Sequence, residues 1–196
     1  MKDIFLKKII IAAITVTLFI SCKSSHTYSE DKKNAITKMY KTDQEIQSYN
    51  KNRFGDQKYL DSMNLAVKKV FEENCLVVKK YFNENSFPGI KENGKDTALQ
   101  FWAIVQHSDH DVKFQKKVLK AMEKELQNNN VSRRNYAYLS DRVLKNKGEK
   151  QLYGTQITWE TGLPTPYPLK YPEKLDEMRK EMGLEPISEY LASFLN

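Results

Sequence analysis

Apolar residues recur at helical spacing through most of the chain. Over the longest such stretch, Leu60, Met63, Val67 and Phe71 follow one another every three or four residues, as on one face of a helix. Similar stripes and their flanking turn residues predict five long helices. They span about 34–50, 57–83, 96–108, 111–128 and 133–146, with Ser132 as a candidate N-terminal cap of the fifth.

The pattern changes after residue 148. Residues 151–159 alternate in the manner of a strand, with Tyr153, Thr155, Ile157 and Trp159 on one face. The next segment, 165–172, is rich in proline and is at best an extended edge strand. Two shorter helices are expected at about 173–182 and 187–194. The sequence therefore predicts a mainly α fold, a single domain of about six or seven helices with one small late β-hairpin.

The first 22 residues indicate export. A basic start precedes an apolar run at 9–20, which is too short to span a membrane alone, and "LFISC" then ends at Cys22. This arrangement resembles a bacterial lipobox, which implies cleavage before Cys22 and attachment of lipid to it. An uncleaved anchor helix is the alternative. We expect a lipoprotein signal peptide at 1–21, a polar tether at 22–33 and the domain at 34–196. That domain would be lipid-anchored in the bacterial cell envelope, outside the cytoplasm.

The net charge limits the kinds of binding partner that we expect, and the cysteine content limits the roles of the two cysteines. The chain has a formal charge of +7, and residues 1–21 contribute three lysines and one aspartate, so the remainder carries +5. The basic residues form no block like a nucleic-acid arm, so we expect a membrane partner and no nucleic acid. Cys75 is the only cysteine besides Cys22, and its apolar surroundings favour a buried structural role.

The densest polar chemistry lies in "VQHSDHDVKFQ", residues 105–115. His107, His110 and Asp111 have the spacing of a helical metal site, but a further ligand is not evident, and we predict neither a metal nor a cofactor. Asp109 or Asp111 is a good candidate to cap the helix that follows. The segment is therefore interpreted as a junction between helices that also lines a polar site.

Acid/base chemistry is the stronger functional interpretation of this region. Asp43 projects from an otherwise apolar helix face, which is costly unless the carboxylate is paired or faces a pocket. Its natural partners are His107, Asp109 and the pair Asp141–Arg142. A purely structural network of the same side chains, which ties helices together, remains open.

A second polar stretch, "QLYGTQ" at 151–156, has a neutral set of hydrogen-bonding groups. Glutamines and a phenol suit amides or sugar hydroxyls, and a glycine in a strand often marks close approach by a ligand. A hairpin whose glutamines satisfy nearby backbone groups is the equal alternative.

Taken in order, these landmarks resemble a known family. They are "DQ" at 43–44, "DSMN" at 61–64, "FPG" at 87–89, the 105–115 segment, "YAYLSDRVLKNKGEKQLYGTQ" at 136–156 and "DEMRKEMGLEPISEYL" at 176–191. This order is similar to that of the bacterial proteins grouped as domain-of-unknown-function family 6624. The resemblance implies no activity. Gln47 and Met178 stand where arginine is usual in that family, so a charge partner is missing at each position.

Two functions are expected from these residues. In the first, a pocket binds a small polar ligand, such as a glycan or peptide fragment, with or without hydrolysis. In the second, the polar cluster is structural and the domain binds another envelope protein without catalysis. The sequence leaves open whether the protein is an enzyme. The residues of the first hypothesis are His107, Asp109 and Asp141 as catalytic groups, and Asp43, Gln115, Arg142, Gln151, Tyr153 and Gln156 as ligand contacts.

Overall fold

The computed structural model describes residues 26–195, and this part of the chain is mainly helical, as predicted. Its helices are α1 (Glu30–Ile46), α2 (Gln57–Asn85), α3 (Ile90–Asn93), α4 (Lys95–Gln106), α5 (Val112–Glu125), α6 (Arg133–Asn146), α7 (Leu175–Glu181) and α8 (Ile187–Ala192). Short 3-10 turns occur at Lys51–Arg53 (η1), Asp109–Asp111 (η2) and Pro172–Lys174 (η3). Strands β1 (Ile157–Thr158) and β2 (Thr165–Pro166) pair antiparallel and form the late hairpin. The fold class is confirmed.

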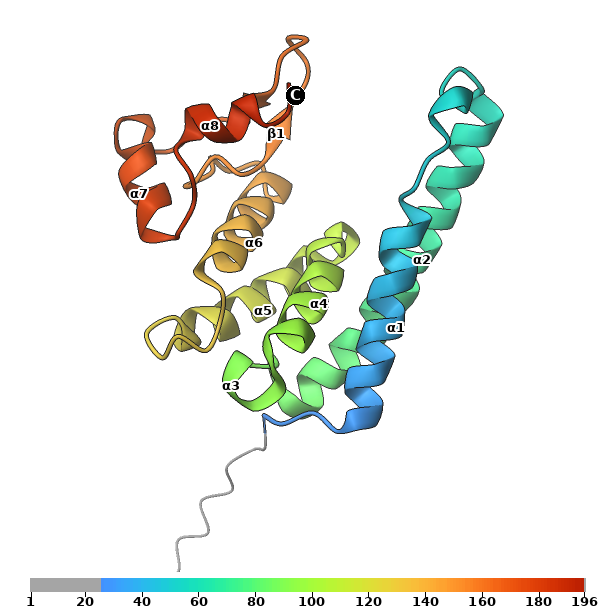
Figure 1. Cartoon of the computed structure of the whole chain (residues 1–196), viewed down its shortest axis with the longest axis vertical. Helices are drawn as coiled ribbons and strands as arrows, with labels where there is room; N and C mark the ends of the chain where they lie inside the picture. Colours follow the sequence, from blue (N-terminus) through green and yellow to red (C-terminus); the bar gives the residue numbers. More distant parts are fainter. Residues whose placement is uncertain (1–25, 196) are drawn as a thin grey trace, which may run out of the picture.

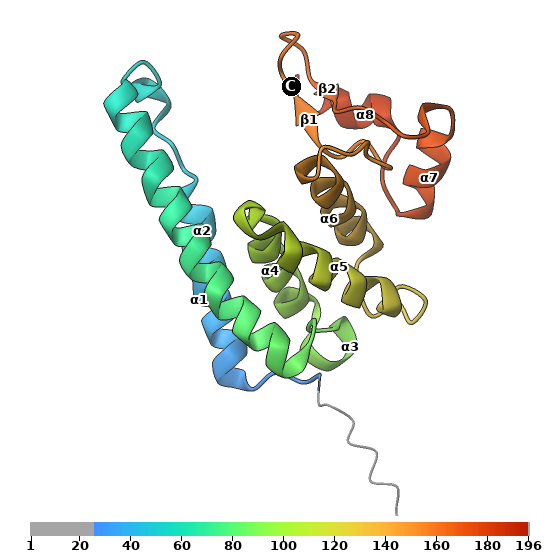
Figure 2. The same ribbon diagram turned by 180° about the vertical axis from the view of Figure 1, so that it is seen from behind.

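The helices form two packed regions that meet at α6. Helices α1 and α2 run side by side as a long hairpin, and α4 and α5 pack beside its lower half (Figure 1). Their shared core contains fully buried Ile36, Val78, Phe101, Ile104 and Phe114. Seen from behind, α6 leads from this bundle to the hairpin, α7 and α8 (Figure 2). A smaller core of Ala137, Tyr153 and Leu184 holds that second region together.

The first helix begins earlier than predicted. Ser29 caps α1 by accepting a hydrogen bond from the Lys32 N–H, so the helix starts at Glu30 and not near residue 34. Tyr28 is buried just before it, donating its N–H to Asn93 Oδ1 (2.7 Å) and its hydroxyl to the Ser86 carbonyl (2.7 Å). Residues 28–33 are thus part of the folded domain, and the predicted tether at 22–33 was too long at this end. Cys22 and the expected signal peptide at 1–21 lie outside the described residues.

The predicted strand at 151–159 is largely wrong. Only Ile157–Thr158 is a strand, and residues 151–156 form an irregular loop that folds around the carboxylate of Asp141. Gly154 has a φ of +64°, a conformation that favours glycine and does not belong to a regular strand. Alternation of side chains could not reveal that the backbone N–H groups bond to a carboxylate and not to a neighbouring strand.

Several local predictions are confirmed. Asp111 caps α5 by accepting the Phe114 N–H at 2.9 Å, and Ser132 caps α6 by accepting the Asn135 N–H at 3.2 Å. Cys75 is buried within the core. Within the part of the chain that the structure describes, no helix is both long enough and apolar enough to cross a bilayer.

Candidate functional site

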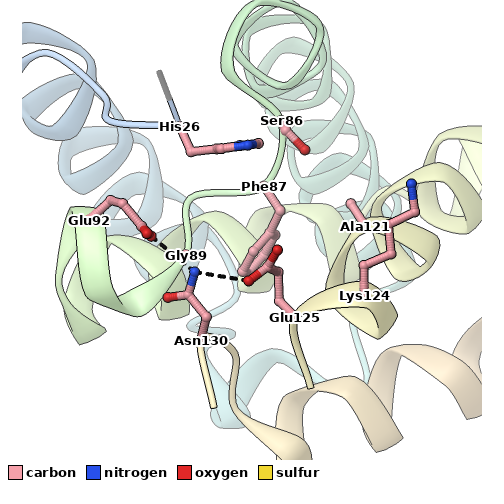
Figure 3. A pocket seen from close by; sticks show the side chains of 9 residues that line it. All are labelled: His26, Ser86, Phe87, Gly89, Glu92, Ala121, Lys124, Glu125 and Asn130. Atoms are coloured by element: carbon pink, nitrogen blue, oxygen red, sulfur yellow. Dashed lines mark hydrogen bonds between the residues drawn. The ribbon is translucent and has the colours of Figure 1, made fainter. Parts of the chain in front are cut away.

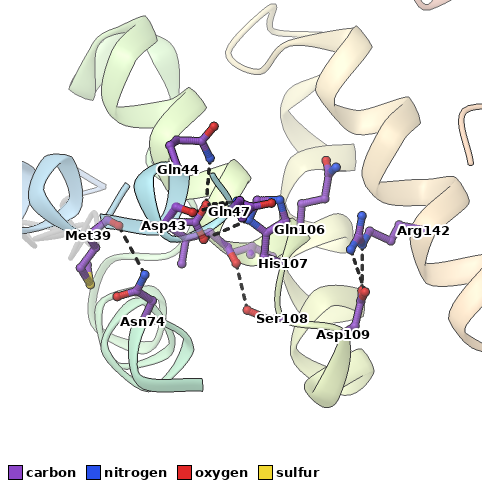
Figure 4. Close-up of polar contacts among 12 residues, drawn as sticks. Met39, Asp43, Gln44, Gln47, Asn74, Gln106, His107, Ser108, Asp109 and Arg142 are labelled. Carbon is purple, nitrogen blue, oxygen red and sulfur yellow. Dashed lines mark hydrogen bonds and ion pairs between the residues drawn. The ribbon is translucent and has the colours of Figure 1, made fainter. Parts of the chain in front are cut away.

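A buried aspartate and a histidine from different helices form the centre of the candidate site. Asp43 lies near the C-terminal end of α1 and is fully buried, while His107 ends α4 with 18% of its side chain exposed. His107 Nδ1 lies 3.0 Å from Asp43 Oδ1 and 2.9 Å from Oδ2 (Figure 4). His107 is one of the partners that the sequence suggests for Asp43, and the structure brings these two side chains into contact.

Neighbouring side chains hold this pair in place. Gln44 Nε2 donates to Asp43 Oδ2 at 2.8 Å, and Gln47 Nε2 donates to the same oxygen at 3.1 Å. Phe71 of α2 stacks on the imidazole, with ring centroids 4.7 Å apart and planes 15° apart. A carboxylate on Nδ1 favours a proton on that nitrogen, which leaves the lone pair on Nε2. His107 is thereby prepared to accept a proton or a ligand hydrogen bond at Nε2.

His107 lines an open groove on the surface. The groove has a volume of about 310 Å³ and lies between α2 and the α4–η2 turn. Val67 and Phe71 give it an apolar wall, and most of the remaining lining is polar. The full lining consists of Asn64, Val67, Lys68, Phe71, Glu72, His107, Asp109 and His110.

Asp109 borders the same groove but has a different chemical character. Arg142 of α6 holds it through two hydrogen bonds, Nε to Oδ1 at 2.8 Å and Nη2 to Oδ2 at 2.7 Å. Asn146 and Gln115 also donate to Oδ1, at 2.7 and 3.1 Å. Burial alone would raise the pKa of Asp109, but these partners, Arg142 above all, lower it to about 2. Asp109 is therefore a fixed carboxylate at neutral pH and cannot be the proton donor.

Asp141, the third predicted catalytic residue, belongs to another network. Its side chain is fully buried and accepts the backbone N–H groups of Leu152, Tyr153 and Thr155 at 2.8–3.2 Å, together with the Thr155 hydroxyl. Burial raises the pKa of Asp141, while these hydrogen bonds act in the opposite direction. The predicted pairing of Asp141 with Arg142 is wrong, because Arg142 bonds Asp109 instead.

The other predicted contacts in "QLYGTQ" are used internally. Gln151 donates Nε2 to the carbonyls of Gln156 and Tyr167, and its Oε1 accepts the Gln156 N–H. Burial raises the pKa of Tyr153 to about 12. Gln156 is also buried, with its amide donating to the Thr155 hydroxyl. The structural interpretation of this segment, in which glutamines satisfy the backbone, describes these contacts.

The predicted site residues therefore separate into two groups. Asp43, His107, Asp109, Gln115 and Arg142 lie at the groove or support its edge. Asp141, Gln151, Tyr153 and Gln156 form the interior of the loop at 151–156.

Reasoning from sequence missed Phe71, Lys68, Gln44 and Asn146. Gln44 had a sequence signal, because it neighbours Asp43 in the "DQ" landmark. Phe71 was assigned only to the core stripe of its helix. A helical periodicity identifies a core position, but it does not show which neighbouring ring the side chain meets.

A second hollow lies at the opposite end of α4, beside residues 86–92 (Figure 3). Its volume is about 460 Å³. Asn130 Nδ2 donates to Glu92 and Glu125 at 3.0 and 3.2 Å and so joins the two carboxylates. A Cβ added to Gly89 would stand 2.3 Å from that Nδ2 atom, so the glycine of "FPG" is needed for packing.

The site shows no arrangement for a metal ion. Among residues 26–195, no three or more His, Cys, Asp or Glu side chains are grouped so that they could hold one. The titratable groups that line the groove are imidazole, carboxylate and ammonium groups.

Comparison with known proteins assigns the chain to a family but does not indicate an activity. Residues 30–195 match the model of DUF6624, described as a family of unknown function. The match covers nearly all of the part that the structure describes. No curated protein and no solved structure matches the chain.

Proposed function

The chain belongs to the DUF6624 family, and we propose that its groove binds a small polar ligand on which His107 acts as a general base. The single observation that supports this proposal is the Asp43–His107 pair, with the carboxylate fully buried and the imidazole in the wall of a groove. A base oriented by a carboxylate is the arrangement that activates a hydroxyl or a water molecule. Hydrolysis of a bond in such a small polar compound of the cell envelope is the activity proposed.

The roles follow from the contacts. Asp43 fixes the proton of His107 on Nδ1, and Gln44 and Gln47 fix the direction of the carboxylate. Phe71 limits rotation of the imidazole because the two rings are nearly parallel. Asp109, with Arg142, contributes a permanently ionised wall to the groove.

The test is a ligand-induced thermal shift with the full-length chain. Chitobiose and a neutral dipeptide amide serve as probes for the wild type, His107→Gln and His26→Gln. His26 is exposed and belongs to the other hollow, so its variant is the matched control. We expect a probe to raise the melting temperature of the wild type and the control by several degrees, but not that of His107→Gln. Equal shifts in all three proteins, or a shift that His107→Gln retains, would contradict the proposal.

A lipid anchor on Cys22 is part of the same proposal. Support comes from the "LFISC" sequence after a short apolar run. Metabolic labelling with a clickable palmitate analogue tests it, with Cys22→Ala as the unlabelled control. Label that persists in Cys22→Ala would contradict the assignment.

The alternative is a non-enzymatic envelope protein that binds a protein partner. One observation favours it, namely an exposed apolar cluster where the hairpin meets the C-terminal residues. Trp159 and Phe194 contact each other edge to face there and are 52% and 39% exposed, with Leu163 and Leu195 also exposed. A Trp159→Ser variant that keeps ligand binding but loses a partner in cross-linking would support this second function.

A further inference from the structure

Two of the three histidines of the chain line the same groove. His107 contributes the imidazole held by Asp43, and His110 contributes a second, exposed imidazole three residues later. Lys68 of α2 lines the groove as well, with 70% of its side chain exposed. One volume of about 310 Å³ thus presents an oriented base, a second acid/base group and a cation.

The lining residues disfavour two common hydrolytic reactions. A histidine–aspartate pair that cleaves peptides commonly acts on a serine or cysteine nucleophile, and no hydroxyl or thiol side chain is present among the groove-lining residues named above. Glycosidases commonly use two carboxyl groups, one of which donates a proton. Asp109 cannot be that donor with a pKa of about 2, which leaves Glu72 as the one other carboxyl group among the lining residues.

From these groups we infer that the groove hydrolyses a phosphodiester, such as one that joins two sugar or polyol units. The inference rests on the proposed function, because it uses His107 as the same general base. His107 Nε2 removes a proton from water as the water oxygen forms a bond to phosphorus. The bond from phosphorus to the leaving alkoxide breaks, and His110 gives that oxygen its proton. The products are a phosphomonoester and an alcohol, and the two imidazoles have exchanged protonation states.

The charges in the groove are compatible with an anionic substrate. Asp109 is neutralised by the two hydrogen bonds from Arg142. Glu72 lies 3.9 Å from Lys68, a separation at which the exposed ammonium remains free to turn toward a phosphate. Lys68 supplies the positive charge that stabilises the charge developing on the phosphoryl oxygens.

The experiment compares two phosphodiesters that differ in their leaving groups. Bis(p-nitrophenyl) phosphate releases a phenolate that needs no proton, whereas glycerophosphoglycerol releases an alkoxide that does. Release of nitrophenol and ³¹P NMR follow the two reactions with the full-length chain. We expect His107→Gln to lose at least 100-fold in kcat/KM on both substrates. His110→Gln should lose at least 100-fold on glycerophosphoglycerol and less than 10-fold on the nitrophenyl ester.

Two further variants sharpen the result. Lys68→Gln should lower kcat/KM on both substrates by a similar factor, because it binds phosphate and transfers no proton. His26→Gln should retain the wild-type rates.

The experiments distinguish failure of this inference from failure of the proposed function. Hydrolysis or binding of chitobiose or the dipeptide through His107, with both phosphodiesters left intact, would overturn this inference and keep the proposed function. An equal effect of His110→Gln on both phosphodiesters would overturn the role of His110 as proton donor. A wild type that neither binds nor hydrolyses any probe would overturn both proposals.

Discussion

Two buried aspartates show how differently the same side chain can be used within one small fold. Asp141 accepts three backbone N–H groups and a hydroxyl from the loop at 151–156. Asp43 bonds side chains, and one of them is an imidazole that lines an open groove. The first aspartate is satisfied by the fold itself, whereas the second orients an imidazole whose Nε2 has no hydrogen-bond partner among residues 26–195. Burial alone therefore does not identify a functional carboxylate. The groups that the carboxylate bonds to distinguish the two cases.

The largest effect is expected at Asp141. Asp141→Ala leaves the N–H groups of Leu152, Tyr153 and Thr155 buried without an acceptor, and each such group costs about 1–3 kcal/mol. The free energy of unfolding should fall by about 3–5 kcal/mol in urea denaturation. A loss below 1 kcal/mol would show that the loop refolds around other acceptors, and the contrast with Asp43 would then disappear.

A smaller stability effect is expected at the groove. His107→Gln keeps a hydrogen-bond donor near Asp43 and exchanges a partly exposed ring, so unfolding should become easier by only about 1–2 kcal/mol. The same variant should abolish the thermal shift caused by ligand. If it instead destabilises the protein as much as Asp141→Ala does, the Asp43–His107 pair is structural.

The pH dependence of stability provides a third test, through Asp109. Its pKa is lowered in the folded protein to about 2, below the ordinary value of about 3.9 in an unfolded chain. Its contribution is therefore fully present above about pH 4 and is lost as the pH falls through about 2. Because 41% of the side chain is exposed, we expect about 1 kcal/mol or less.

The control for this pH effect is Arg142→Met, which removes the charge that lowers the pKa of Asp109. Urea denaturation at pH 5 and at pH 2.5 should show a smaller difference in this variant than in the wild type. An identical pH dependence would assign the effect to other carboxylates.

The smallest effect is expected at Gln106, next to His107. Its Oε1 atom is buried and has no hydrogen-bond partner among the described residues. Gln106→Met removes that unsatisfied acceptor, so stability should be unchanged or should rise by up to about 1 kcal/mol. A clear loss in the melting temperature would mean that the amide of Gln106 has a role that its contacts do not reveal.

The sequence predicts most of this fold because helices leave local signals. Apolar spacing, the caps at Asp111 and Ser132, and the turn residues identify the helices within a few residues. The loop at 151–156 could not be predicted this way. Its conformation depends on Asp141, ten residues earlier, and on Arg179, which donates to the Tyr153 carbonyl at 2.6 Å from 26 residues later. Alternating side chains therefore resembled a strand.

The candidate site was predictable in part. Asp43 stood out because a carboxylate on an apolar helix face needs a partner, and His107 was among the partners expected. The sequence could not distinguish Asp141 from Asp43, since both are aspartates on amphipathic helices. Only the positions of the surrounding N–H groups separate them, and those positions follow from tertiary packing.

The hydrogen bonds that fix His26 and Tyr28 to Ser86 and Asn93 have a consequence for where the protein can act. His26 is the first described residue, and its carbonyl accepts a hydrogen bond from Asn93 at 2.9 Å, so the chain is fixed to the domain from this point. If Cys22 carries lipid, three residues lie between it and His26, and the four Cα–Cα steps span at most about 14 Å. Asp43 follows Glu30 by 13 residues of helix, or about 20 Å. A protein anchored in this way would stay close to the membrane surface, and its groove would reach substrates within a few nanometres of the membrane.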